Sequence, residues 1–429
     1  MDQIQLTHAF RAGEITASEY ISQVENYFSS REPSVHAFLP EENRFERLRK
    51  EADDDLVARF PSPGTRPPLF GMMVGVKDIF HVDGFVTQAG SQLPSNELQG
   101  TEAESVTRLK QAGALILGKT VTTEFAYFTP GPTRNPHNSA HTPGGSSSGS
   151  AAAVGAGMCS LALGTQTIGS LIRPAAFCGA VTLKPTYERI SRNGVIPLSP
   201  SFDHIGFFTP DISTAKQVAP SIYKDWNNSI SLDGKPTIGI PEGPYLALAS
   251  DYALTCFNTI CKSLSDAGYE LRRIPVMSDF QYIRAHHDII MSCDAAQVHA
   301  DWFKKYENLY SIKLTDLIHR GQKITSIHLQ DALQACDRFR KQITQTMNEH
   351  NIDLWICPPA IGPAPKGLDS TGDPVMNLPW TQIGFPAINL PAGKNEEGLP
   401  MGLQVIGNWY TDEALLAWAE DIERIVSTP

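Results

Sequence analysis

The chain has 429 residues, of which 41% are hydrophobic and 19% charged, so it is long enough to bury a large core. Its formal net charge of −11 is typical of a soluble protein and gives no electrostatic footprint for nucleic acid. The N-terminus has no basic start followed by an apolar run, and no stretch reaches the roughly eighteen apolar residues that cross a bilayer. We therefore expect a cytoplasmic protein with no nucleic-acid partner and no membrane partner.

The seven cysteines favour neither a disulfide framework nor a structural zinc site. Their number is odd, and the sequence contains no Cys-x-x-Cys pair and no Cys/His cluster. The histidines form no His-Glu-x-x-His pattern either. We therefore expect buried free thiols, no metal and no other cofactor.

The N-terminal segment, residues 1–60, reads as helical. Thr16 and Glu19 form a capping box ahead of an apolar face, which marks the start of a helix. Residues 42–59 are charged with apolar residues interspersed, the pattern of an amphipathic surface helix. Residues 61–68 are rich in proline and predict a linker into the first core strand.

A strand–helix–strand unit follows the linker. Residues 72–77 read as a short buried strand, residues 104–112 as a helix and residues 115–120 as the next strand. A buried strand here would carry Lys77 into the interior of the protein.

The second half of the chain continues the alternation of strands and helices. The predicted elements are a strand at 237–241, a helix at 252–266, a strand at 270–274, a mostly helical insert at 279–350, a strand at 354–359, a strand pair at 384–391 and 400–407, and a closing helix at 411–426. This alternation favours a layered α/β fold, which we expect to form one domain over residues 1–429.

Serine and glycine are concentrated in residues 144–186 beyond what a structural helix or strand would use. Residues 144–150 read GGSSSGS, and residues 164–170 read GTQTIGS, followed by Arg173-Pro174 and LKPT at 183–186. Glycine permits unusual backbone angles and the close approach of a substrate. Upstream, residues 75–78 read GVKD.

Together these motifs resemble the amidase signature family, whose members hydrolyse amides with a Ser–Ser–Lys triad. Position by position, the resemblance implies Lys77 as the base, Ser146 as the bridging serine that relays the proton, and Ser170 as the nucleophile. It also implies a cis peptide bond between Gly145 and Ser146. The separation of 24 residues between Ser146 and Ser170 matches the family, and short motifs rarely reproduce such a spacing by chance.

The resemblance assigns further roles around the triad. The implied oxyanion hole consists of the backbone N–H groups of Thr167, Ile168, Gly169 and Ser170. The implied supporting residues are Asp78, Gly145, Thr165 and Arg173.

The chemistry of amide hydrolysis explains why a buried lysine matters. A serine nucleophile needs a base for its proton and donors for the developing oxyanion. Lysine accepts a proton only when neutral, and its free pKa is about 10.4. Lowering this pKa to near 7 takes roughly 4–5 kcal/mol of desolvation or neighbouring charge. A buried strand supplies that environment for Lys77, between Val76 and Ile79.

The resemblance extends over residues 60–220 and 350–426. Further matching segments are TTEFA at 122–126, NPHN at 135–138, Gly384-x-Pro386-Ala387 and the stretch from Gly398 to Gln404. The implied fold is an α/β/α sandwich with a large central mixed β-sheet. The implied partner is a small-molecule amide, and a homodimer is compatible with the family. The insert at 279–350 is expected to line the substrate pocket.

Three positions depart from the usual family pattern. Ile168 stands where a second glycine is usual, which narrows the pocket and excludes a left-handed conformation at this position. Gln166 replaces a frequent aspartate, and Arg173 lies one place later than in the commonest pattern. The last two changes resemble a bacterial branch that includes biuret-type hydrolases.

Other interpretations remain open at this stage. Residues 145–149 also satisfy Gly-x-Ser-x-Gly, the nucleophile elbow of α/β-hydrolases, with Ser147 as nucleophile. That fold needs an acid and a histidine downstream, for which His299, His319, His328 and His350 are available. The glycine-rich loop lacks the Gly-Lys-Ser/Thr of a nucleotide-binding loop.

An amidase-like subunit of a tRNA-dependent amidotransferase would share the same fold and triad. The sequence therefore does not separate such a subunit from a free-standing amidase. Arg173 and Arg192 are candidate anchors for a substrate carboxylate, and the sequence does not decide between them.

Overall fold

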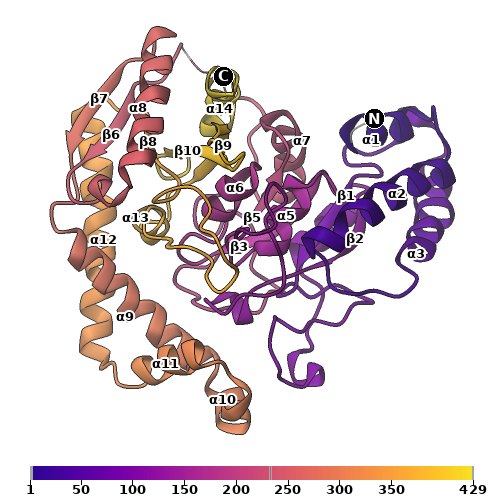
Figure 1. Ribbon diagram of the computed structural model, residues 1–429, viewed down its shortest axis with the longest axis horizontal. Helices are drawn as coiled ribbons and strands as arrows, with labels where there is room; N and C mark the ends of the chain where they lie inside the picture. The colour runs from indigo at the N-terminus through magenta and orange to yellow at the C-terminus, as the bar shows by residue number, and fades with distance from the viewer. Residues whose placement is uncertain (1–2, 231, 233, 428–429) are drawn as a thin grey trace.

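The computed structural model describes residues 3–230, 232 and 234–427. Met1 and Asp2, with which the predicted helical segment 1–60 begins, lie outside the described residues. A ten-stranded sheet runs through the molecule in the order β2-β1-β3-β5-β4-β9-β10-β8-β6-β7 (Figure 1). The predicted α/β fold around a large mixed sheet is confirmed.

The sheet combines parallel and antiparallel pairs. Its strands are β1 (Met73–Lys77), β2 (Leu115–Thr120), β3 (Leu161–Gln166), β4 (Val181–Lys184), β5 (His204–Thr209), β6 (Ile238–Glu242), β7 (Leu271–Pro275), β8 (Leu354–Cys357), β9 (Ala387–Lys394) and β10 (Pro400–Gly407). β1 pairs in parallel with both β2 and β3, and β6 pairs in parallel with both β7 and β8. The strands between these two groups pair antiparallel.

Helices flank the sheet. They are α1 (Gln3–Ala12), α2 (Ala17–Val35), α3 (Arg44–Lys50), α4 (Glu104–Gln111), α5 (Ser148–Gly155), α6 (Ile172–Cys178), α7 (Ile212–Ile222), α8 (Asp251–Asp266), α9 (Phe280–Val298), α10 (Ala300–Tyr306), α11 (Ile312–Gly321), α12 (Ser326–Glu349), α13 (Leu378–Gln382) and α14 (Asp412–Val426). The N-terminal helices α1–α3 lie at one end of the molecule, and α8–α12 lie at the other (Figure 1).

Side chains alternate between two hydrophobic cores, one on each face of the sheet. Met73 and Leu115 pack with α1, α2 and α5 in one core, whereas Val74 and Ile116 belong to the other, together with α4, α7 and α14. This alternation follows from the two-residue period of a strand. Both faces of β1 are therefore covered, and all five of its residues are buried.

Most predicted elements are present with shifted ends. The Thr16 side chain accepts from the Glu19 backbone N–H while Glu19 accepts from the Thr16 N–H, which confirms the capping box. The predicted helix at 42–59 is α3 continued by a π-helix, Glu51–Val57. The insert at 279–350 consists of α9–α12.

Residues 148–235 hold elements that the sequence analysis left unassigned, among them β3, β4, β5, α5 and α6. Every described residue of these five elements is buried, apart from the half-buried Gly155 at the end of α5. A segment buried on all sides shows no amphipathic period, so periodicity gives no sign of it.

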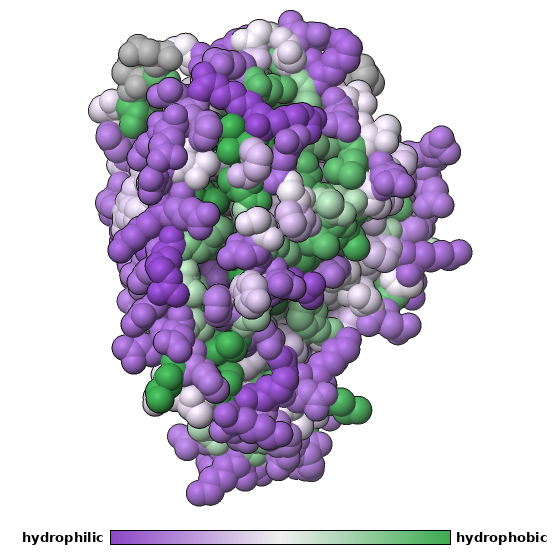
Figure 2. All heavy atoms as spheres, turned by 90° about the vertical axis from the view of Figure 1, so that its left-hand side faces the viewer, coloured by the Kyte–Doolittle hydropathy of each residue, from purple (hydrophilic) through white to green (hydrophobic). Residues whose placement is uncertain are grey.

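Figure 2 faces the end of the molecule formed by α8 and α12, where hydrophobic side chains gather in the middle and hydrophilic ones surround them.

Within the described ranges, no helix is both long and apolar enough to cross a membrane. All seven cysteines are free, and all except the half-buried Cys256 are buried.

Candidate active site

The ends of two adjacent parallel strands bring the predicted residues together. β1 ends at Lys77, whose side chain is completely buried, and β3 ends at Gln166, just before the turn that carries Ser170. The loop that carries Ser146 leads into α5. Parallel neighbours end at the same edge of a sheet, so lysine and serines meet there.

Three hydroxyl groups surround the amine of Lys77. Its Nζ lies 2.7 Å from Ser146 Oγ, 2.7 Å from Thr165 Oγ1 and 3.1 Å from Ser147 Oγ. The Ser147 hydroxyl donates to the Thr165 carbonyl at 3.1 Å, so its hydrogen is already committed. A neutral amine has two hydrogens and one lone pair. In its neutral form, Lys77 can therefore donate to Ser147 and to one other hydroxyl and accept from Ser146 or Thr165.

Burial lowers the pKa of Lys77 well below its ordinary value, and the negative charge of Asp203 partly opposes this shift. Burial also raises the pKa of Asp203 to about 6. The Asp203 carboxylate accepts from Thr167 Oγ1 at 2.6 Å and from the backbone N–H groups of Leu198 and Ser199 at 2.8 and 3.0 Å. Asp203 therefore holds the turn before Ser170 as well as acting on the lysine.

Ser146 and Ser170 both line one small cavity of about 10 Å³, roughly the space of one water molecule. The other residues that line it are Ala126, Tyr127, Phe128, Thr167, Ile168, Arg173, Leu198, Thr371 and Pro374. The peptide bond between Gly145 and Ser146 is cis, as the resemblance implied.

The turn before Ser170 presents free backbone donors. Among the described residues, no hydrogen bond uses the N–H of Ile168, Gly169 or Ser170, whereas those of Leu171 and Ile172 donate to Gln166 Oε1 at 2.8 and 3.0 Å. Donors without a protein acceptor beside a serine suit an oxyanion.

Two side chains hold this turn from its other side. Gln166 Nε2 donates to Thr381 Oγ1 at 2.9 Å, and Thr381 Oγ1 donates to the Ile168 carbonyl at 2.6 Å. A Cβ atom on Gly169 would lie 2.2 Å from Asn377 Oδ1, so only glycine fits at that position. Ile168 does not have a positive φ, which explains why a branched residue fits there.

Arg173 is buried beside the serines. Its Nε donates to the Thr371 carbonyl at 2.8 Å, and its Nη2 donates to the Gly145 carbonyl at 2.7 Å. Its Nη1 is buried and has no hydrogen-bond partner among the residues that the structure describes. Burial lowers the pKa of Arg173 to about 10, and the charge of Asp373 opposes that shift. Arg173 thus ties the Ser146 loop to the segment around Thr371 and keeps one donor free.

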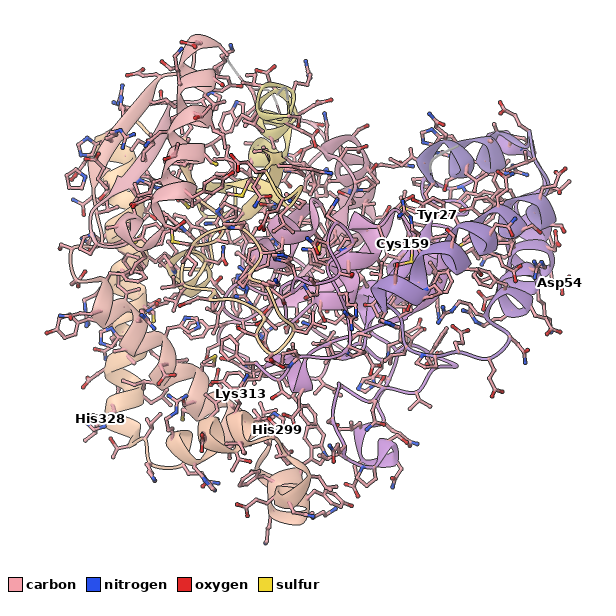
Figure 3. All side chains as sticks on the ribbon, viewed as in Figure 1. Tyr27, Asp54, Cys159, His299, Lys313 and His328 are labelled. Carbon is pink, nitrogen blue, oxygen red and sulfur yellow. The ribbon has the colours of Figure 1, made fainter. Side chains whose placement is uncertain are left out.

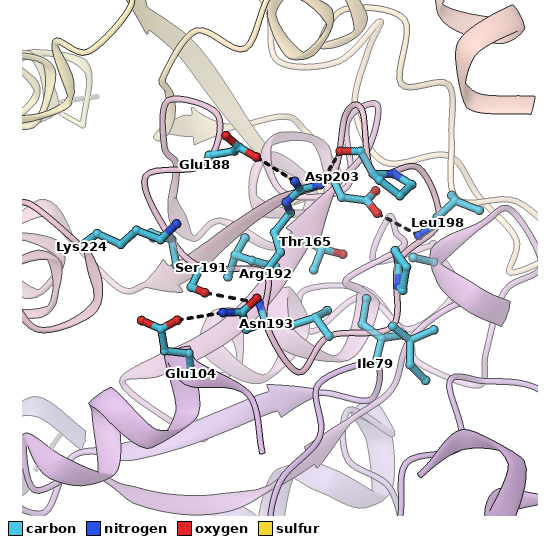
Figure 4. A pocket seen from close by; sticks show the side chains of 17 residues that line it. Ile79, Glu104, Thr165, Glu188, Ser191, Arg192, Asn193, Leu198, Asp203 and Lys224 are labelled. Atoms are coloured by element: carbon cyan, nitrogen blue, oxygen red, sulfur yellow. Dashed lines mark hydrogen bonds and ion pairs between the residues drawn. The ribbon is translucent and has the colours of Figure 1, made fainter. Parts of the chain in front are cut away.

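Two predicted residues lie away from this cavity. Asp78 was expected to support the serine loop, but its carboxylate pairs with Lys119 at 2.7 Å and accepts from the Gln88 N–H at 3.0 Å. Arg192 lines a second, larger cavity, where it pairs with Glu188 at 2.9 Å (Figure 4). Of the two candidate anchors, only Arg173 reaches the cavity of the serines.

No residue of the insert at 279–350, which was expected to line the substrate pocket, is among the residues that line this small cavity. The insert packs instead against Ser199 and Phe202, which follow the lining residue Leu198 in the chain. Asp294 accepts from Ser199 Oγ at 2.6 Å, and the His287 ring stacks on Phe202 with 4.1 Å between centroids.

Sequence reasoning missed Asp203, Thr371, Asn377 and Thr381. The last three lie roughly 200 residues beyond Ser170 along the chain, and no local motif marks them.

Among the described residues, no group of three or more His, Cys, Asp or Glu side chains is placed to hold a metal ion.

Comparisons with known proteins agree with the resemblance. The family described as Amidase matches residues 44–416. One subunit of the glutamyl-tRNA(Gln) amidotransferase of Synechococcus sp. (strain RCC307) is 30% identical over 465 residues, covering 97% of this chain and 95% of that protein.

Solved structures agree as well. A crystal structure of an amidase superposes with a TM-score of 0.87 and 27% identity, over 99% of this chain and 100% of the other. A structure from a vestigial protein complex, described as revealing the origins of an s-triazine catabolic enzyme, gives a TM-score of 0.87 with 25% identity, over 99% and 98% of the two chains.

Replacing Gln166 by leucine is expected to lower the free energy of unfolding by about 2–4 kcal/mol, because each buried donor left unpaired costs about 1–3 kcal/mol. Denaturant unfolding measures this loss. The control is Gln345→Leu, at an exposed glutamine of α12 that donates to Glu349, where the change should stay within about 0.5 kcal/mol. Equal losses in the two variants would show that Gln166 does not hold the turn.

Proposed function

The chain belongs to the amidase signature family, whose members hydrolyse amide C–N bonds, and we propose that it cleaves a small carboxylic amide through an acyl-enzyme on Ser170. In this proposal Lys77 is the base and Ser146 relays the proton between lysine and nucleophile. The backbone N–H groups of residues 167–170 form the oxyanion hole.

The reaction has two stages. Ser170 Oγ attacks the amide carbon while its proton passes through Ser146 to Lys77, and the oxyanion is held by the free N–H groups. The proton returns through Ser146 to the leaving nitrogen, the C–N bond breaks, and an amine departs. Water then attacks the ester on Ser170 and gives its proton to the same relay, which passes a proton back to Ser170 Oγ as the ester C–O bond breaks and the acid is released.

The observation that carries the proposal is the hydrogen-bond set of Lys77. The lysine is fully buried, and its nearest partners are hydroxyls. Such surroundings favour the neutral amine, which is the form that accepts a proton. Because Ser147 has committed its own hydrogen elsewhere, Ser146 is the partner that both contacts Lys77 and reaches the cavity.

The α/β-hydrolase alternative receives no support from this geometry. The Ser147 side chain is completely buried, and its partners are Lys77 and the backbone of Thr165. No histidine is among these partners, whereas a nucleophile elbow requires one.

The shape and polarity of the cavity favour a short acyl group. A volume of about 10 Å³ leaves little room, and Ile168 and Phe128 contribute to its walls. The free Nη1 of Arg173 suits an acyl group that ends in a carboxylate or another polar oxygen. We therefore propose short-chain amides, including ureido and biuret-type compounds, as the first substrates to test.

The relatives named as amidotransferase subunits support a second candidate, an amidase-like subunit of a tRNA-dependent amidotransferase that works inside a complex. Affinity purification from the native source separates the two. Stoichiometric recovery of further subunits would favour the complex, and an active chain recovered alone would favour the free-standing amidase.

A fluorophosphonate is expected to form a covalent adduct on Ser170, found by peptide mapping. Ser170→Ala should abolish turnover, and Ser146→Ala should slow it by about 10²–10⁴ because it breaks the proton relay. Labelling at Ser147 instead would contradict the proposal and favour the α/β-hydrolase alternative.

The rate is expected to rise with pH, because free Lys77 must lose its proton before it can act as a base. Since burial lowers the pKa of Lys77, this rise should lie below the ordinary lysine pKa of about 10.4 and give a neutral-to-alkaline optimum. Lys77→Met should remove the rising limb together with most of the rate. An optimum near pH 5 in the pH profile of kcat/KM would argue against lysine.

Succinic acid monoamide is expected to react faster than butyramide, an uncharged amide of similar size. Arg173→Lys should reduce this preference, measured as the ratio of kcat/KM values, by about tenfold because hydrogen bonds to charged groups contribute about 1.5–3 kcal/mol. Arg192→Lys, in the neighbouring cavity, is the matched control and should leave the ratio unchanged. A ratio that does not respond to Arg173→Lys would exclude the anchor.

A further inference from the structure

One wall of the catalytic cavity is built from a backbone in an unusual conformation. Residues 124–128, called here the wall segment, contribute Ala126, Tyr127 and Phe128 to the cavity lining. Phe125 has a φ of 44° and Ala126 a φ of 60°, both in the left-handed region. Side chains with a Cβ rarely adopt this region, so two in succession persist only where surrounding contacts hold them.

Those contacts come from the helical insert. The ring of Phe125, which is 1% exposed, stacks on Trp302 and on Tyr310 with 5.8 Å between centroids in each case. It also meets the edge of His299 at 4.7 Å. His299 in turn shares a hydrogen bond of 3.1 Å with the Tyr310 hydroxyl. We call Phe125, His299, Trp302 and Tyr310 the ring clamp.

Polar contacts tie the two ends of the wall segment to the same part of the insert. The backbone N–H of Ser311 donates to Glu124 Oε1 at 3.0 Å. At the other end, Lys313 Nζ donates to the Phe128 carbonyl at 3.2 Å, and Thr129 Oγ1 donates to Ser311 Oγ at 2.8 Å. In Figure 3, His299 and Lys313 lie where the insert meets the body of the molecule.

From these contacts we infer that the ring clamp positions the wall segment and thereby sets the size of the acyl group that the cavity accepts. The inference rests on the proposed amide hydrolysis and adds its specificity-determining residues. It also gives the insert a role in substrate selection, although none of its residues lines the cavity. Aromatic rings at these distances attract one another beyond the area they bury, so removing one ring frees the loop without touching Ser146, Ser170 or Lys77.

The test uses Trp302→Leu and Tyr310→Leu in the full-length protein. Hydrogen exchange of peptides covering residues 122–130 reports the wall, and the ratio of kcat/KM for hexanamide to that for acetamide reports the acyl size. Both variants are expected to speed exchange in the wall segment and to raise the ratio by about tenfold, the scale on which apolar pockets discriminate chain length.

Two controls separate the clamp from general stability. Tyr310→Phe keeps the stacked ring and should behave like the unmodified protein. Trp226→Leu removes another half-buried tryptophan, one that packs on Tyr223 far along the chain from the wall segment, and it should change neither readout. A melting curve for each variant shows whether it is folded.

The result that overturns the inference is unchanged exchange, or an unchanged ratio, in both leucine variants at the clamp. An equal response in Trp226→Leu would overturn it as well. If the unmodified protein hydrolyses none of the amides, the proposed function fails, while the exchange measurement still decides whether the clamp holds the wall.

Discussion

The central constraint in this molecule is an amine held away from water at the end of β1. Lys77 is surrounded by hydroxyl groups, and Asp203, the carboxylate whose charge acts on it, accepts from Thr167 and two backbone N–H groups. Desolvation therefore outweighs charge attraction, and the lysine pKa falls. A solvated lysine on a surface strand would keep its proton at neutral pH and would not serve as a base.

Keeping that amine dry requires the architecture around it. β1 lies between two parallel neighbours, both of its faces are covered by hydrophobic cores, and the loops at its end are tied together across long stretches of sequence. Arg173 links Gly145 to Thr371, and Gln166 reaches Thr381, which holds the carbonyl of Ile168. These links join segments about 200 residues apart in the sequence around the serines.

A residue of the site could be predicted from the sequence where a short motif carries it. The contacts of Lys77 with Ser146 and Thr165 could be anticipated because short motifs at characteristic spacings carry all three residues. Asp78, in the turn directly after the lysine, was assigned to the serine loop, but its side chain pairs with Lys119 of the neighbouring strand β2.

The remaining parts of the site depend on contacts distant in sequence. Asn377 excludes any side chain at Gly169, and Trp302 and Tyr310 stack on Phe125. No periodicity or local motif encodes such pairs, and helical character alone gave no indication of what the insert contacts.

The order of the strands also bears on how the chain is made. The hairpin β9–β10, close to the C-terminus, lies between β4 and β8 and is the part of the sheet through which its two halves are joined. Until residue 407 has left the ribosome, β4 and β8 each present an unpaired edge, and such edges invite pairing with other chains. The edge of β4 therefore stays unpaired while residues 185–386 are being made, and that of β8 while residues 358–399 are being made.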